Sequence, residues 1–176
     1  MFAWSRHIYI QIAPQQVQLR VPQTGAWLSE SADIALTHTA QGHRVIAAVG
    51  TAARQLQTSA NVQLLQPFAH PRSIISDVEV AEALLRHTIR QVLQMRWIMW
   101  APTVVIHPLG LPEGGWTAVE MRALHAMAIG AGARKAYVWT GQPLPDQAIL
   151  AAPRPFMGGQ WWWPAVKVGL PESPVQ

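Results

Sequence analysis

The chain has 176 residues, of which 50% are hydrophobic and 12% are charged, so it can bury one folded core and is too apolar to be intrinsically disordered. The absence of cysteine excludes disulfides and thiol chemistry, and we expect neither a transmembrane helix nor a signal peptide, which fits a cytoplasmic protein. The net charge of +4 comes from eleven arginines and two lysines that are spread singly, which favours scattered surface charge and gives no reason to expect a nucleic-acid partner.

The N-terminal part reads as a series of short strands. Residues 7–12 and 16–21 both alternate between apolar and polar side chains, which predicts a β-hairpin. Further strands are predicted at 32–37, 45–49 and 61–65. Thr51 follows Gly50 and is the predicted N-cap of a short helix that ends near Gln57.

Two helices and two buried strands follow. Ser76 and Glu79 have the spacing of a capping box and predict a helix that ends between 94 and 97. Residues 103–106 form an apolar run, Thr117 and Glu120 repeat the capping-box pattern, and residues 136–139 form a second apolar run. This strand–helix–strand order predicts two parallel neighbours in a buried sheet.

Several segments together resemble the bacterial actin homologue MreB. The segments are 61–67, 74–86, 102–106, 117–124 and 131–138, and they occur in the order found in that family. The run Thr117-Ala118-Val119-Glu120-Met121-Arg122-Ala123-Leu124 is similar to the family's Thr-Glu-Val-Glu-Arg-Arg-Ala. The resemblance covers about residues 7 to 150.

The resemblance implies an α/β, actin/Hsp70-like (ribonuclease H-like) mixed sheet with flanking helices, present here as a single half-actin domain. We therefore expect a domain over residues 1–150 and a proline- and tryptophan-rich tail over 151–176. The expected location is the cytoplasm, with or without contact to the membrane surface, since the first six residues combine apolar rings with a cation.

The nucleotide motifs of the family are degenerate in this chain. Where the family's first phosphate loop has Ile-Asp-Leu-Gly-Thr, this sequence has Gln11 for the metal-linked aspartate, Ala13 for the glycine and Pro14 for the threonine. Proline has no N–H to donate to a phosphate. The family's Glu-Glu-Pro corresponds to 141–143, which reads Gly-Gln-Pro, so both acids are missing. These departures from the family's motifs imply that the chain has no cofactor and no catalytic residue, and that it does not hydrolyse ATP alone.

Other sites are also weakly indicated. The seven histidines show no convincing metal-ligand spacing, so no metal site is predicted. His107 ends the central strand, where α/β sites often lie, but a histidine bonded to backbone or water is the favoured interpretation. The 114–115 glycine pair could bind an anion before a helix, although a plain turn is favoured.

The predicted interaction residues fall into two groups, namely Trp161, Trp162 and Trp163 in the tail and Met121, Arg122 and His125 in the helix over 117–131. The tryptophans have two open interpretations: an added strand that covers apolar surface, or a partner surface. The functional hypothesis is a non-catalytic scaffold that binds itself, as a homodimer, or a filament or cell-envelope protein linked to bacterial cell shape. The alternative is an ATP-binding protein whose site is completed by another chain.

Overall fold

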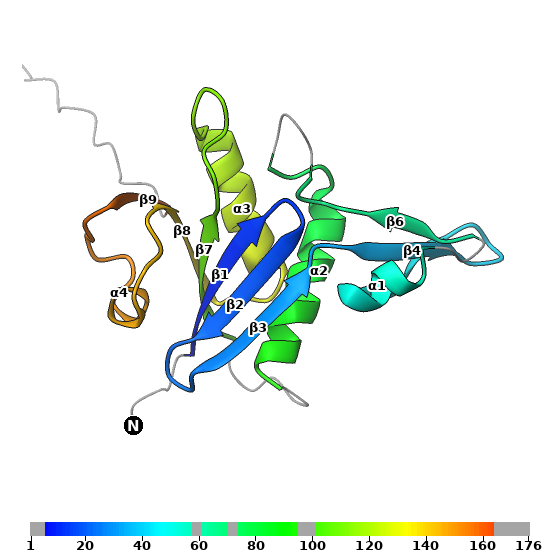
Figure 1. Ribbon diagram of the computed structural model, residues 1–176, viewed down its shortest axis with the longest axis horizontal. Helices are drawn as coiled ribbons and strands as arrows, with labels where there is room; N and C mark the ends of the chain where they lie inside the picture. Colours follow the sequence, from blue (N-terminus) through cyan, green and yellow to red (C-terminus); the bar gives the residue numbers. More distant parts are fainter. Residues whose placement is uncertain (1–5, 58–60, 70–73, 95–100, 164–176) are drawn as a thin grey trace, which may run out of the picture.

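The computed structural model describes residues 6–57, 61–69, 74–94 and 101–163. Its main element is a six-stranded sheet in the order β3-β2-β1-β7-β8-β9 (Figure 1). The strands of this sheet are β1 (His7–Ala13), β2 (Gln16–Val21), β3 (Ala26–Ser31), β7 (Thr103–Pro108), β8 (Lys135–Gly141) and β9 (Gly159–Trp163). The neighbours β1, β7 and β8 are parallel, whereas the three outer strands pair antiparallel.

The strand patterns explain most of this sheet. The predicted hairpin of β1 and β2 is confirmed, with Ile10 opposite Leu19, and the predicted parallel pair of β7 and β8 is confirmed as well. Strand β3 was missed because Ser29 and Glu30 interrupt its apolar pattern. It forms because the exposed edge of β2 supplies backbone partners, with Leu19 opposite Leu28.

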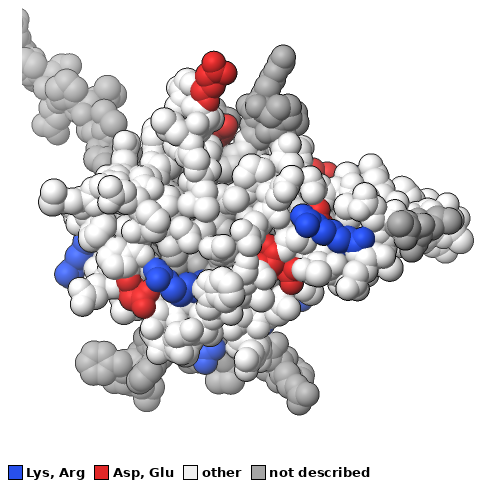
Figure 2. All heavy atoms as spheres, in the orientation of Figure 1, with Lys and Arg blue, Asp and Glu red and all other residues white. Residues whose placement is uncertain are grey.

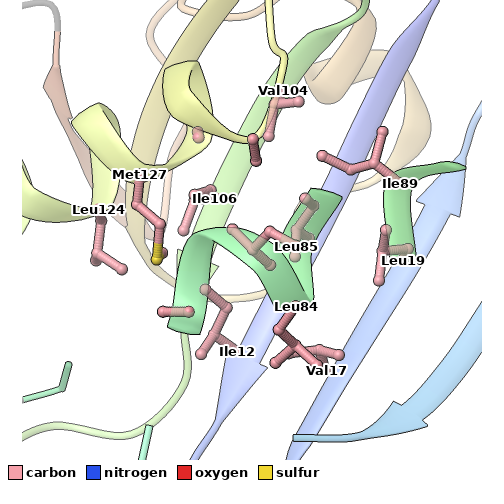
Figure 3. Packing of buried hydrophobic residues seen from close by; sticks show 14 of the residues in the cluster. Ile12, Val17, Leu19, Leu84, Leu85, Ile89, Val104, Ile106, Leu124 and Met127 are labelled. Carbon is pink, nitrogen blue, oxygen red and sulfur yellow. The ribbon is translucent and has the colours of Figure 1, made fainter. Parts of the chain in front are cut away.

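Helices α2 (Val78–Val92) and α3 (Ala118–Gly130) cover one face of the sheet. Figure 3 shows the core between them and the sheet, with labelled side chains from both helices and from β1, β2 and β7. The side chains labelled there are Ile12, Val17, Leu19, Leu84, Leu85, Ile89, Val104, Ile106, Leu124 and Met127, and all are buried. The apolar stripes that define these helices in the sequence are therefore the faces that pack on the sheet.

The helix ends agree only in part with the sequence patterns. The capping box of α3 is confirmed, because Thr117 and Glu120 bond reciprocally. The capping box expected at Ser76 is wrong. Asp77 is the N-cap and accepts from the Val80 N–H at 3.1 Å, whereas the Ser76 hydroxyl donates to the carbonyl of Pro67 at 3.2 Å.

A second, three-stranded sheet projects from the main body on the right of Figure 1. It consists of β4 (Ile34–His38), β5 (Arg44–Val49) and β6 (Gln63–Leu65), in the order β5-β4-β6, with helix α1 (Thr51–Gln55) beside it. Thr51 is the first helical residue and not the N-cap, which is Gly50. Its hydroxyl and N–H instead donate to Glu30 at 2.5 and 2.7 Å, and the fully buried Asp33 pairs with Arg54. These contacts tie α1 to the junction between the two sheets.

The opposite face of the main sheet has a smaller core. It contains five buried residues: Tyr9, Val105, Trp139, Leu144 and Ile149. Leu144 and Ile149 come from the segment after β8, which includes helix α4 (Asp146–Leu150) and then returns as β9. The chain beyond β8 thus covers the sheet face that α2 and α3 leave open.

Candidate functional site

The carboxyl ends of β1, β7 and β8 meet at one edge of the main sheet. The chain leaves β1 toward β2 on one side and leaves β7 toward β8 on the other, so this edge is a topological switch point. Open α/β sheets commonly bind ligands at such a point. Residues 11–14 and 141–143, which occupy the positions of the family's nucleotide motifs, lie at or just beyond the ends of β1 and β8.

The β1–β2 turn is a tight connection with little capacity to hold a phosphate. Ala13 pairs with Gln16, so Pro14 and Gln15 alone form the turn. The carbonyl of Gln15 accepts from the N–H of Ala32 at 3.0 Å. Because Pro14 has no N–H, the turn cannot supply the series of backbone donors that a phosphate cradle needs.

A small hollow lies beside Gln11 on the face opposite α2 and α3. Its volume is about 180 Å³, and it is lined by Tyr9, Gln11, Gln18, Leu19, Arg20, Trp27, Pro143 and Leu144. None of these lining residues carries a carboxylate, and the volume is below the roughly 300–1,000 Å³ of typical small-molecule pockets. The residues of this described hollow therefore do not fit a magnesium–nucleotide complex.

Tyr9 and His107 connect β1, β7 and β8 through hydrogen bonds near the carboxyl ends of these strands. The Tyr9 hydroxyl lies 2.5 Å from His107 Nδ1, and His107 Nε2 lies 3.0 Å from the carbonyl oxygen of Gly141. The N–H of Leu144 donates to the Tyr9 hydroxyl oxygen at 3.1 Å. The favoured interpretation of His107, a strand-end histidine bonded to backbone, is confirmed.

Burial controls the acid–base properties of this pair. It raises the pKa of Tyr9, although the Leu144 N–H and the Arg20 charge oppose the rise. Burial likewise lowers the pKa of His107, against the opposing effect of its bond to Gly141. Both groups are therefore biased toward their neutral forms near neutral pH.

Arg20 extends the same network from β2. Its Nη2 donates to the carbonyl of Leu144 at 2.7 Å, its Nε lies 3.2 Å from a carboxylate oxygen of Asp146, and its guanidinium lies 5.5 Å from the centre of the Tyr9 ring. Sequence reasoning missed Tyr9, Arg20 and Leu144. No local pattern links them, because Tyr9 and Leu144 are 135 positions apart.

Trp161 and Trp162 of the tail pack against the rest of the domain. The Trp161 ring packs on Trp139, with ring centres 4.9 Å apart, and its Nε1 donates to the carbonyl of Arg154 at 2.9 Å. Trp162 faces the helix-covered core, and its Nε1 donates to the Thr140 hydroxyl at 2.7 Å. The side chain of Trp163 lies outside the described part of the structure.

The predicted interaction residues of α3 lie on different sides of the helix. Met121 is buried in the core, Arg122 is exposed and His125 is half-buried. Burial lowers the pKa of His125. The outer face of the helix instead presents Val119 and Ile129, which are 78% and 42% exposed.

Two further observations concern the described residues as a whole. Nowhere among them do three histidines or acids lie close enough together to hold a metal ion, and none of their helices is long and apolar enough to span a bilayer. Figure 2 shows that lysines and arginines on the visible face are scattered, with acidic and uncharged residues between them. The N-terminal segment 1–5, for which membrane contact was considered, lies outside the described residues.

Comparison with known sequences identifies relatives of this chain. Residues 5–147 match the family described as MreB/Mbl protein. The cell shape-determining protein MreB of Escherichia coli is 30% identical over 138 residues, which is 77% of this chain and 38% of that protein. MreB of Haemophilus influenzae shows the same identity and coverage. The chain thus spans less than two fifths of the length of these curated relatives.

Solved structures show the fold. The structure of MreB5 of Spiroplasma citri bound to AMPPNP matches with a TM-score of 0.59 at 22% identity. The match covers 78% of this chain and 39% of the MreB5 chain. A double helical filament of MamK has a TM-score of 0.55 at 14% identity, with 75% and 40% covered. The fold expected from the sequence is confirmed: it is an actin-like mixed sheet with flanking helices, and the matched part spans about two fifths of each of those solved chains.

Proposed function

The chain belongs to the MreB/Mbl family, and we propose that it acts as a non-catalytic scaffold or interaction module of that family. The observation that carries this proposal is the self-contained hydrogen bonding at the strand ends. The Tyr9 hydroxyl bonds to His107, His107 bonds to the Gly141 carbonyl, and Arg20 bonds to the Leu144 carbonyl, so these bonds are all made within the chain. We place the protein in the cytoplasm, as the family resemblance implies.

The strand-end residues support the absence of ATP hydrolysis by this chain alone. Nucleotide and Mg²⁺ would need backbone donors and a carboxylate at the end of β1. Pro14 has no N–H, and Gln11 offers an amide where a negative charge would be needed. The competing function, an ATP site completed by another chain, would need that chain to bring both features.

The outer face of α3 is the surface that we propose for partner binding. Val119, Arg122, Ala126 and Ile129 are all exposed and recur at spacings that place them on one side of the helix. Exposed apolar side chains around a central arginine are typical of interface centres. The buried Met121 does not belong to this face, and His125 lies at its border.

The partner that we favour is a second copy of the chain, and the other candidates are a filament protein or a cell-envelope protein. One of the matched structures is a MamK filament, and another is a non-polymerising MamK mutant bound to AMPPNP, with a TM-score of 0.58 at 16% identity. MamK thus assembles through an actin-like fold of the same kind. That likeness supports self-association here without specifying its geometry.

Light scattering coupled to size exclusion, with and without Mg-ATP, tests the proposal. We expect a dimer or larger species whose amount rises with protein concentration and whose size is the same with and without Mg-ATP. Val119→Glu should shift it to monomer, because it replaces an apolar contact with a carboxylate that the interface would have to desolvate. Met157→Glu is the matched control, since Met157 is 90% exposed and lies far along the chain, after α4.

Three results would contradict parts of this proposal. Nucleotide binding, or assembly only with Mg-ATP, would favour the completed ATP site instead. Assembly that survives Val119→Glu would exclude the α3 surface. A monomer at all concentrations would exclude self-association and leave only binding to a different protein.

A further inference from the structure

The bonds around His107 allow only one arrangement of protons. Gly141 presents a carbonyl oxygen, so Nε2 must carry the proton that is donated to it. Nδ1 is then an acceptor, and it receives the Tyr9 O–H. The Tyr9 oxygen in turn accepts from the N–H of Leu144. The two nitrogens of His107 keep these roles only when the ring is neutral.

We propose that Tyr9 and His107 form a pH-sensitive lock that holds residues 141–144 against β1 and opens when His107 takes up a second proton. The lock joins three strands at the carboxyl edge of the sheet, and through Leu144 it positions the start of α4. This inference concerns a conformational switch and does not depend on the proposed scaffold function.

Protonation breaks the lock because an imidazolium ring donates from both nitrogens. Nδ1–H would then face the Tyr9 oxygen, which already accepts from Leu144. The Tyr9 proton would then have to leave Nδ1 and turn toward Gln11, whose side chain also hydrogen-bonds to the Tyr9 hydroxyl. The buried imidazolium charge would still have no anionic partner, which is unfavourable.

The charged groups around the lock do not relieve this cost. Arg20 of β2 lies over the Tyr9 ring and carries the same sign as a protonated His107. Asp146 of α4 is the nearby acid among the described groups that contact the network, and it already pairs with Arg20. The lowered pKa of His107 agrees with this geometry, because no anion is placed to stabilise its charged form.

Opening would release one side of the molecule only. Leu144 and Ile149 belong to the smaller core, together with Val105 and Trp139, and Trp139 Nε1 donates to the carbonyl of Gln142 at 2.8 Å. If residues 141–144 detach, these apolar side chains become accessible to solvent. The larger core beneath α2 and α3 does not depend on these bonds.

The sign of the pH effect follows from the lowered pKa. The open state binds a proton at the ordinary histidine pKa of about 6.5, whereas the locked state binds it only at lower pH. The lock is therefore fully stable above about pH 6.5 and is weakened as the pH falls below that value. In this window, protection should fall about tenfold per pH unit.

Hydrogen exchange of the full chain between pH 8 and pH 5, corrected for the intrinsic rate, tests the lock. We expect residues 141–150 to lose protection below about pH 6.5 while α2 keeps it. His107→Gln should abolish this pH response, because glutamine can accept from Tyr9 and donate to Gly141 but does not titrate. His125→Gln is the control: it removes another histidine of lowered pKa and should leave the response intact.

Two further measurements keep the proposal testable if His107→Gln fails to fold. Tyr9→Phe should leave residues 141–150 poorly protected already at pH 8. Nitrogen NMR at pH 8 should show a protonated Nε2 and an unprotonated Nδ1 on His107. A wild-type chain with no response between pH 8 and 5, a response that persists in His107→Gln, or the opposite tautomer would each overturn the lock.

Discussion

Replacement of the Trp161 side chain by alanine should lower the stability of the fold. The ring packs against Trp139 at 4.9 Å and against Tyr137 at 6.3 Å between ring centres, and its N–H bonds to Arg154. Replacement of a fully buried tryptophan by alanine costs about 3–5 kcal/mol. Because Trp161 is only half-buried, we expect Trp161→Ala to lower the free energy of unfolding by about 2 kcal/mol, roughly half of that range.

Urea denaturation followed by circular dichroism measures this change. Trp161→Phe keeps a ring on Trp139 but loses the bond to Arg154, so we expect a smaller loss of about 1 kcal/mol. Met157→Ala, at a residue that is 90% exposed in the same segment, should change stability little and serves as the control. Unchanged stability in Trp161→Ala would refute the packing argument and favour the open alternative, a tryptophan surface for a partner.

Three other substitutions test separate contacts by the same denaturation assay. Thr117→Ala removes the capping box of α3 and should cost about 1 kcal/mol, whereas Thr117→Ser should retain most of it; equal losses would contradict a role for the hydroxyl. Arg86→Met removes bonds to Glu82 at 2.5 Å and to the Gly130 carbonyl at 2.8 Å. Because Arg86 is partly exposed, we expect the substitution to lower the free energy of unfolding by only about 0.5–1 kcal/mol. This loss should change little with added salt if the bond to the carbonyl contributes most of it. Gly159→Ala should cost about 2 kcal/mol or more, because a Cβ there would overlap the Trp139 ring and a backbone carbonyl; wild-type stability would show that the β8–β9 pairing can shift.

Most of the main sheet could be predicted from the sequence because its information is local. The alternation in β1 and β2 specifies which face of each strand is buried, and the apolar stripes of α2 and α3 specify which side of each helix packs. The missed strand β3 shows the limit of such patterns. Its own residues do not alternate, and it is a strand because β2 offers an unpaired edge.

Only the residue chemistry of the candidate site could be read from the sequence. Gln11 and Pro14 in the place of an aspartate and a threonine argue against a phosphate site, and this argument needs residue chemistry alone. The sequence also identified His107 as a strand-end histidine. It could not identify Tyr9 as its partner, because the two residues are 98 positions apart.

The sequence by itself therefore determined the family, the helix faces and the departures from the family's nucleotide motifs, each of which depends on residue types at short spacing. Tertiary structure alone decided that Asp77 and not Ser76 caps α2, that Trp161 and Trp162 face two different cores, and that Leu144 completes a lock with Tyr9. Those outcomes depend on where distant segments of the chain meet. The physical reason is that a buried polar group must find a partner in space, and that partner can lie anywhere along the sequence.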